Sequence, residues 1–432
     1  MPRAAQTVSG AGGPNNDSPE LRRMLDALFR REQSRLVARV LRIVGPARLD
    51  FAEDVAQDAL LAAARTWPYR GAPDNPEAWL HRVAKNKALD RLRRERVAAD
   101  FARTPEIEPE PAESPEQAAL EDQLTDDDLQ LIFLCATDLL APLDRVAVTL
   151  NVAMGFTARE IGRLYLTSEA AMAQRLARAK RRLRKSEFRL DAFAPIERRR
   201  RRQDALKAVY LAFALGFAPA SGAESVRRDA AEDALRLARL LADTPETAGP
   251  DAEALAALCC FQASRFEARM TAEGAFTPLP EQDRCLWLKP LIDEGFARLA
   301  AAQSAECVTR YHLEAGIAAC HAAAADFESS DWAAIGRFYD LLKHMFGSPV
   351  IAVNAAAARA LAGDAAGALK ELEALEGDAV LRDYAPYFVA RADALERLDR
   401  KTEAASWFAR AIEAGGAAPE LAHLEGRLAA CL

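Results

Sequence analysis

The sequence of 432 residues lacks several features that would mark particular classes of protein. No stretch approaches the roughly 20 apolar residues of a membrane-spanning helix, which excludes an integral membrane protein. The N-terminal segment has no apolar core of the kind that secretory signals carry, so we expect no export. The seven cysteines form no C-x-x-C pair, and their odd number favours reduced thiols in a cytoplasmic protein.

Signatures of catalysis are also missing. The sequence has no P-loop, no G-x-S-x-G elbow and no dinucleotide fingerprint. Four of its five histidines, His312, His321, His344 and His423, are scattered through the back half, and the adjacent Cys320 and His321 have poor spacing for a metal site. We therefore expect no catalytic residues, no metal and no cofactor, against the alternative of an enzyme housed in the back half.

Charge is distributed unevenly, although the net charge is only −7. Residues 1–103 carry a net charge of +6 and residues 129–202 a net charge of +9, whereas residues 104–128 hold ten acidic residues and no basic one. Residues 203–432 carry a net charge of −12. Two basic blocks ahead of an acidic half indicate a front that binds a polyanion, although solvated helix faces would give the same pattern.

Nearly every periodic segment has the three- and four-residue spacing of an amphipathic helix, and no useful stretch alternates as a strand does. The predicted fold class is all-α. In the front we expect helices over about 21–44, 52–67 and 76–96, the second stopping before Pro68. The proline-rich acidic residues 104–128 cannot bury enough apolar surface to fold, which predicts an extended linker.

Residues 157–184 have the pattern of a helix-turn-helix. Thr157 and Glu160 are spaced as a capping box that begins a short helix, and Phe156 and Ile161 are spaced as a hydrophobic staple. A second helix, expected from Ser168, has an apolar face and an opposite basic face that could read DNA, the alternative being an ordinary corner between two surface helices. The residues expected on the apolar face are Met172, Leu176, Ala179 and Leu183, and those on the opposite face are Ala170, Gln174, Arg178, Arg181 and Lys185.

The helix expected over 76–96 has a second basic face. Arg82, Asn86 and Arg93 share this face, and Trp79 lies at the start of the helix. Cations, an amide and an aromatic ring suit a single strand whose bases have left the stack. For Trp79 a position in the core is the more common outcome.

Together these residues resemble an alternative sigma factor of bacterial RNA polymerase, of the extracytoplasmic-function type within the sigma-70 family. Asp54–Leu60 is similar to the polymerase-binding helix of that family. Asn75–Arg94 is similar to its promoter-melting, minus-ten-reading helix, and Thr157–Arg184 to its minus-thirty-five reader. The order of the motifs and both basic blocks agree with the family over about residues 21–186.

The resemblance implies a cytoplasmic, nucleoid-associated protein whose partners are core RNA polymerase and promoter DNA, with no membrane, cofactor or metal. The residues implied in core polymerase binding are Asp54, Gln57, Asp58 and Leu61. Those implied at the minus-ten element are Trp79, Arg82, Lys85, Asn86, Asp90, Arg93 and Arg94. Those implied at the minus-thirty-five element are Ser168, Ala170, Ala171, Gln174, Arg175, Arg178, Arg181 and Lys185.

The back half is similar to the subfamily that bears a long helical extension with tetratricopeptide-like repeats. One departure is that Ala214-Leu215 stand where that subfamily usually has Asn-Glu. Similar positions recur 34 to 36 residues apart over 361–408, near the tetratricopeptide period, and an irregular helical bundle stays open as the alternative. The motifs that carry the similarity are Tyr210–Phe213, Glu281–Arg284 with Trp287, and Ser348–Val350 with Asn354.

We expect this extension to act in cis as a regulatory or interaction domain, with a protein or small-molecule partner. The alternative is a helix-turn-helix regulator with a tetratricopeptide-like sensor that does not bind core polymerase. The predicted organisation is a disordered N-terminus over 1–20, sigma region 2 over 21–97, an acidic linker over 98–128, sigma region 4 over 129–187, a helical family-specific extension over 188–302 and tetratricopeptide-like repeats over 303–432.

Overall fold

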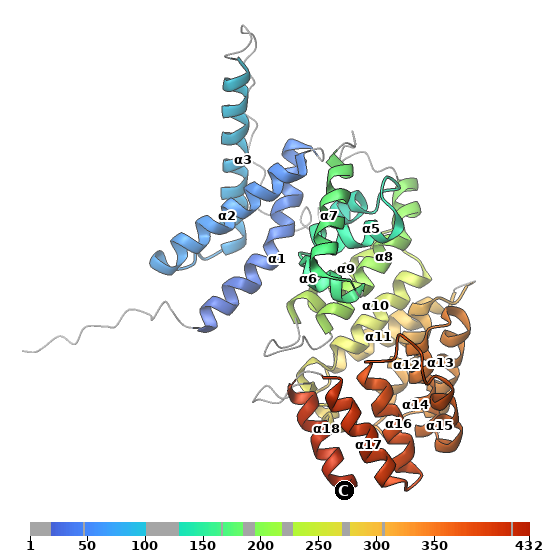
Figure 1. Ribbon diagram of the computed structural model, residues 1–432. Coiled ribbons are helices and arrows are strands. Elements are labelled where there is room, and N and C mark those ends of the chain that lie inside the picture. Colours follow the sequence, from blue (N-terminus) through green and yellow to red (C-terminus); the bar gives the residue numbers. More distant parts are fainter. Residues whose placement is uncertain are drawn as a thin grey trace, which may run out of the picture. The chain divides into compact units, whose positions relative to one another are not determined.

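The regular elements of the protein are helices. Within the described residues of the computed structural model no strand occurs, which confirms the all-α prediction (Figure 1). The chain divides into two compact units, residues 1–205 and 206–432. No helix among the described residues is long and apolar enough to cross a membrane. The structure describes residues 19–45, 48–100, 129–165, 167–184, 195–217, 228–269, 277–304, 307–415 and 418–432, so most of the predicted N-terminal segment and the acidic linker lie outside it.

Three long helices form the first part of unit 1, and each packs against the other two. The second helix does not stop before Pro68, as predicted, but continues to Arg70. Pro68 lies in the last turn, where it removes one N–H from the hydrogen-bond ladder, and the helix ends soon after it at Gly71 (φ 77°), whose N–H is bonded to the Trp67 carbonyl. The helices are α1 (Pro19–Val44), α2 (Leu49–Arg70) and α3 (Pro76–Asp100).

A charged cluster is buried between α1 and α3. The Glu32 side chain has no solvent exposure, its Oε1 accepts a hydrogen bond of 2.8 Å from Arg35 Nη1, and its Oε2 lies 3.2 Å from His81 Nε2. Burial by itself would raise the pKa of Glu32, but the contact with His81 and the charge of Arg35 lower it below its usual value. The ionised carboxylate therefore ties the two helices together.

The second part of unit 1 consists of short helices. Residues 129–135 are helical, as predicted from Leu129 onward. Arg201, at the predicted boundary, donates a 2.9 Å hydrogen bond to the Phe133 carbonyl, and Arg145 pairs with Asp204 at 2.9 Å, so the arginine run packs on this part. The other elements are α5 (Pro142–Val148), the π-helical η2 (Thr149–Ala153), α6 (Ala158–Leu164), α7 (Glu169–Arg184) and α8 (Pro195–Phe217), within which the division between the units falls.

The first part of unit 2 is organised around one central helix, α10 (Pro250–Ala263), most of whose side chains are buried. It packs against α9, α11 and α12. Gly295 of α11 lies against the Phe261 ring, where an added Cβ would come within 2.7 Å, so only glycine permits this approach. The surrounding elements are α9 (Arg228–Asp243), η4 (Phe266–Ala268), η5 (Leu279–Glu281), η6 (Arg284–Leu286), α11 (Lys289–Ala301), η7 (Ala302–Ser304) and α12 (Arg310–Ala323).

The second part of unit 2 repeats a pair of helices. The pair α14 and α15 begins at Pro349 and Ala365, and the pair α16 and α17 begins 36 residues later at Ala385 and Lys401. The turn inside each pair has a left-handed residue at the same offset, Gly363 (φ 102°) and Asp399 (φ 60°). The elements are α13 (Trp332–Phe346), α14 (Pro349–Leu361), α15 (Ala365–Ala374), α16 (Ala385–Arg397), α17 (Lys401–Glu413) and α18 (Ala418–Cys431).

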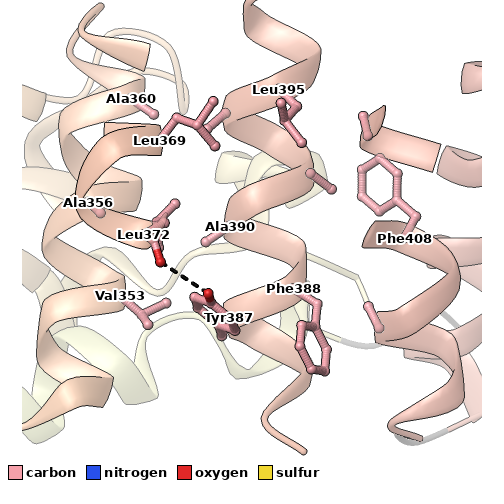
Figure 2. Close-up of a cluster of buried hydrophobic side chains, with 14 of the residues drawn as sticks. Val353, Ala356, Ala360, Leu369, Leu372, Tyr387, Phe388, Ala390, Leu395 and Phe408 are labelled. Atoms are coloured by element: carbon pink, nitrogen blue, oxygen red, sulfur yellow. Dashed lines mark hydrogen bonds between the residues drawn. The ribbon is translucent and has the colours of Figure 1, made fainter. Parts of the chain in front are cut away.

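Equivalent positions of the two pairs build one core (Figure 2). Leu372 of α15 and Phe408 of α17 are both fully buried, and they are the matched positions of the repeat. Between them Tyr387 donates a 3.0 Å hydrogen bond to the Leu372 carbonyl, which satisfies the only polar atom of that side chain. The repeat in the structure is therefore 36 residues long, at the upper end of the 34 to 36 residues that the sequence suggested.

Candidate nucleic-acid interface

The outer face of α2 carries all four residues predicted for polymerase binding. Asp54, Gln57 and Asp58 are exposed, and Leu61 beside them is 45% exposed although it is apolar. The opposite face of the helix, including Val55 and the neighbouring alanines, is fully buried. An apolar side chain set beside carboxylates on an otherwise packed helix is a plausible contact point for a partner protein.

The predicted basic face of α3 is open to solvent. Leu80, Ala84 and Ala88 fill the opposite, buried face. The helix begins where predicted, because Asn75 Oδ1 accepts a 2.9 Å hydrogen bond from the Ala78 N–H as an N-cap. Six of the seven predicted minus-ten residues are exposed on this helix: Arg82, Lys85, Asn86, Asp90, Arg93 and Arg94.

Trp79, the seventh, lies half-buried in an aromatic cluster. Its ring meets Trp67 edge to face at 5.4 Å, and Trp67 in turn meets Phe29 at 5.9 Å. Only part of the Trp79 ring is therefore open for stacking. Tyr69, near the end of α2 and seven residues before the start of α3, is 87% exposed and is the freer aromatic ring. The sequence analysis did not single out Tyr69.

The helix-turn-helix start signals are present as predicted. The Glu160 N–H donates to Thr157 Oγ1 at 3.2 Å, and the Thr157 N–H donates to Glu160 Oε2 at 2.7 Å, which completes the capping box. Phe156 and Ile161 are buried in the staple positions. Gly162 approaches the turn so closely that a Cβ would lie 2.9 Å from the Thr167 carbonyl oxygen. The sharp angle between α6 and α7 thus depends on a glycine.

The faces of α7 are divided as the periodicity predicted. Met172, Leu176, Ala179 and Leu183 are buried. Arg175 is half-buried and pairs with Asp144 of α5, so it fixes α7 on its support as well as bordering the open face. Lys185 lies outside the described residues. The predicted residues that are exposed are Ser168, Ala170, Ala171, Gln174, Arg178 and Arg181.

A hollow of about 490 Å³ lies beside this face, between α5 and α7. Arg178 and Ala171 line it together with two residues that the sequence analysis did not place in the site, Thr167 and Arg182. Thr167 lies in the turn, and Arg182 lies one helical turn beyond Arg178. The candidate surface is therefore wider than a single stripe of α7.

Two basic residues of α7 have partners within unit 1. Lys180 Nζ lies 2.5 Å from Glu53 Oε1, and Arg184 pairs with Asp50, both carboxylates belonging to α2. Neither Lys180 nor Arg184 was among the predicted DNA contacts. Their engagement by carboxylates separates them from the open cations Arg178 and Arg181.

The motifs of the back half have structural partners inside unit 2. Tyr210 donates a 3.2 Å hydrogen bond to Glu314 Oε1, and burial raises the pKa of that carboxyl. The Asp283 side chain caps η6, and the nearly buried Gln282 donates to the Thr277 carbonyl at 2.9 Å. Asn354 lines a cavity of about 380 Å³.

This cavity is largely apolar and lies where α14, α16 and α18 meet. Its polar groups besides Asn354 are His423, Asp393 and Arg427, the last two joined by a 2.8 Å ion pair. Burial raises the pKa of Asp393. Among the described residues no group of three or more histidine, cysteine, aspartate or glutamate side chains could hold a metal ion.

Comparison with known proteins finds family matches in two parts of the chain. Residues 28–97 match the sigma-70 region 2 family, and residues 201–303 match a family of unknown function, DUF6596. An uncharacterized protein of Rhizobium meliloti (strain 1021), R00370, is 34% identical over 388 residues, which cover 88% of this chain and 90% of that protein. No solved structure matches. The chain belongs to the same family as R00370, and its region 2 makes it a sigma-70 family factor.

Proposed function

We propose that the protein is an alternative sigma factor of the extracytoplasmic-function type that loads onto core RNA polymerase and opens promoter DNA. Its α2 face, with Asp54, Gln57, Asp58 and Leu61, docks on the polymerase. The α7 face reads the minus-thirty-five element as duplex, and the α3 face takes the minus-ten element as a single strand. The sigma-70 region 2 match over 28–97 supports the class of function.

The observation that carries the proposal is the pairing of two different cationic faces in one chain. The α7 helix begins with small exposed residues, Ala170 and Ala171, so its backbone can approach a major groove closely, and Arg178 lies about two turns further along. The α3 face instead sets Asn86 among cations, with the exposed ring of Tyr69 nearby in sequence. A protein that only binds duplex DNA has no need of the second face.

Melting on this scheme follows from binding. Removing a base from the stack costs a few kcal/mol. Contacts of the DNA backbone with Arg82, Lys85 and Arg93 offset this cost, as do contacts of the base with Asn86 or Tyr69. No ATP and no covalent step is required. The acidic residues 104–128 would pass through the cleft of the polymerase that later holds RNA, as a nucleic-acid mimic that the transcript displaces.

Unit 2 is proposed to act in cis on this activity, as a regulatory or interaction domain. Its helix pairs with a 36-residue offset favour a tetratricopeptide-like arrangement over an irregular bundle, since matched positions such as Leu372 and Phe408 serve the same core. The cavity lined by Asn354 is a candidate site for a protein segment or a small molecule.

Run-off transcription with purified core polymerase tests the proposal. Wild type should direct initiation from defined start sites on genomic fragments. A variant with Asp58→Arg and Leu61→Glu should lose this activity and its co-purification with core polymerase while keeping duplex binding. Arg337→Gln, an exposed charge change on α13 of unit 2, is the control and should behave as wild type.

The same measurements separate the alternative, a helix-turn-helix regulator that does not bind polymerase. That regulator would bind promoter fragments but would neither co-purify with core polymerase nor confer start sites. The role of unit 2 is tested by truncation after Phe217, which retains the contacts of Arg201 and Asp204 with unit 1. Full, unregulated transcription by the truncated chain, with its helicity checked by circular dichroism, would show unit 2 to be dispensable.

A further inference from the structure

A cavity of about 380 Å³, which we call the unit 2 cavity, lies between the two parts of unit 2. Three helices of the second part, α14, α16 and α18, line most of it, and Pro278 and Pro280 at η5 of the first part line the rest. Pockets that hold small organic molecules measure about 300–1,000 Å³, so the unit 2 cavity is large enough for a small ligand.

The walls of the unit 2 cavity are mainly apolar. Val353 of α14 and Ala390 of α16 line it and also belong to the buried core of the helix pairs (Figure 2). Three of the lining residues are prolines, Pro278, Pro280 and Pro386, which have no backbone N–H to offer a ligand. An occupant therefore gains mostly from the burial of its own apolar surface.

Two polar side chains of the cavity are available to a ligand. The amide of Asn354 forms no hydrogen bond with any described residue, and its atoms are open to solvent. His423 uses one ring nitrogen, because its Nδ1 lies 3.1 Å from Glu281 Oε1. A carboxylate accepts hydrogen bonds, so Nδ1 carries the hydrogen, and Nε2 of the neutral ring is left as an acceptor.

The charged groups at the cavity already have partners. Arg427 forms a 2.8 Å ion pair with Asp393 and a second ion pair with Glu396, which does not line the cavity. Burial raises the pKa of Asp393, so this wall is poorly hydrated. A charged ligand would give up its hydration without meeting an unpaired charge, which makes a neutral ligand the better fit.

We propose that the unit 2 cavity binds a small neutral molecule that is mainly apolar and carries a group that both donates and accepts hydrogen bonds, as an amide does. The Asn354 amide matches such a group with its own donor and acceptor, and His423 Nε2 accepts a further N–H or O–H. The inference gives a ligand class to the regulatory role proposed for unit 2, and it rests on that role only for its meaning in transcription.

The same walls argue against a peptide as the occupant. An extended chain brings an N–H and a C=O with nearly every residue, and buried ones need partners. The lining helices use their own backbone groups internally and the lining prolines have no N–H, so the side chains of Asn354 and His423 would have to serve the whole peptide backbone. A compact molecule with one amide group can instead be satisfied completely.

The test compares three related probes by equilibrium dialysis against the full chain. The neutral probe is 1-naphthylacetamide, its anionic analogue is 1-naphthylacetate, and its cationic analogue is 2-(1-naphthyl)ethylamine. The amide should bind with a dissociation constant below about 1 mM. The two charged analogues should bind wild type no better than they bind Ala357→Phe, a variant whose added ring fills the cavity.

Further variants locate the amide probe in the cavity. Asn354→Leu keeps the size of the side chain but removes its amide, and His423→Phe keeps a ring but removes its nitrogens. Each should weaken binding by about threefold to tenfold, the effect of a lost hydrogen bond, and Ala357→Phe should abolish it. Glu425→Gln, an exposed change on α18 outside the cavity, is the control and should bind as wild type does. Thermal unfolding checks that each variant is folded.

Equal binding of 1-naphthylacetamide to wild type and to Asn354→Leu would overturn the proposal. Tighter binding of either charged analogue that Ala357→Phe abolishes would also overturn it. Displacement of the amide by a lower concentration of a capped trileucine peptide would identify a peptide groove and contradict a small-molecule site. The test needs neither polymerase nor DNA, so a failure of start-site selection with intact probe binding would count against the proposed sigma activity alone.

Discussion

Arginines serve opposite purposes in the two units. On α7, Arg178 and Arg181 extend into solvent. In unit 2, Arg391 and Arg410 lie 3.9 Å and 4.3 Å from the centre of the Trp407 ring, and Arg391 is 6% exposed. The guanidinium groups of Arg178 and Arg181 are therefore open to solvent, whereas those of Arg391 and Arg410 cover an aromatic ring.

Charge counts alone do not make this distinction. Unit 2 is acidic overall, yet its arginines matter to its core, whereas the basic blocks of unit 1 keep much of their charge at the surface. Removing a covered arginine should reduce stability, and removing an open one should reduce binding. The substitutions below test this contrast. The first concerns Glu32, a charged residue of unit 1 that is buried, whereas Arg178 and Arg181 are open to solvent.

Glu32→Gln should have the largest effect on stability. It removes the carboxylate that pairs with Arg35 and His81 inside the three-helix domain. We expect unit 1 to lose about 3–5 kcal/mol, because the buried Arg35 guanidinium loses the carboxylate with which it pairs. Urea unfolding followed by circular dichroism measures the change. A loss below about 1 kcal/mol would show that the cluster contributes little to the packing of α1 on α3.

The same cluster predicts a pH dependence. The pKa of Glu32 is lowered in the folded protein, so its contribution to stability is complete above its unfolded value, near 4.5, and is lost as the pH falls through the lower folded value. Wild type should therefore lose more stability on acidification than Glu32→Gln does. Parallel unfolding profiles of the two proteins below pH 4.5 would contradict this assignment.

Arg391→Ala should destabilise unit 2 by about 2–3 kcal/mol. The change removes a 3.0 Å ion pair with Glu376, a 3.1 Å hydrogen bond to the Tyr387 hydroxyl and the stacking on Trp407. Promoter binding should not change. Arg397→Ala, an exposed change on the same helix, should stay within about 0.5 kcal/mol of wild type and serves as the control.

Arg178→Ala should show the reverse pattern. We expect a loss of about 1–3 kcal/mol in promoter affinity if Arg178 contacts a base edge, and a change in stability within about 0.5 kcal/mol. Fluorescence anisotropy with promoter and scrambled duplexes measures the first, and urea unfolding the second. Arg337→Ala, an exposed arginine of α13, is the control for net charge, and equal losses for the two variants would mean that only non-specific charge is lost.

Thr157→Ala should have the smallest effect, about 1 kcal/mol of stability. It removes the hydroxyl that accepts the Glu160 N–H at the start of α6. Thr157→Ser keeps that hydroxyl and should be nearly neutral. If the serine variant loses as much stability as the alanine variant, the methyl group of Thr157 stabilises the protein and its capping hydroxyl does not.

The helix-turn-helix shows what local pattern can predict. The spacing of Met172, Leu176, Ala179 and Leu183 identified the buried face of α7, because a helix turns by a fixed angle per residue. The capping box followed from Thr157 and Glu160 for a similar local reason. The course of α2 through Pro68 was not predicted, since a proline removes only one hydrogen bond from the ladder and the helix continues for two residues beyond it.

Features that depend on distant partners were not predictable in this way. Arg265 has no informative neighbours in the sequence, and its environment comes from Phe217 on α8 and Trp287 after η6. Similarly, Arg175 was expected on the DNA face, but Asp144 of α5 partly covers it. Exposure of an individual cation depends on what packs beside it, which a helical period does not encode.

By itself the sequence determined the all-α class, the two cationic helices of the front and the resemblance to a sigma factor, because these depend on composition and on residues close along the chain. Only the tertiary structure decided which arginines stay open, that Glu32 is buried against Arg35 and His81, and that the C-terminal helix pairs repeat every 36 residues. The physical reason is that solvation and charge pairing are set by neighbours in space, and folding chooses those neighbours from segments far apart in the chain.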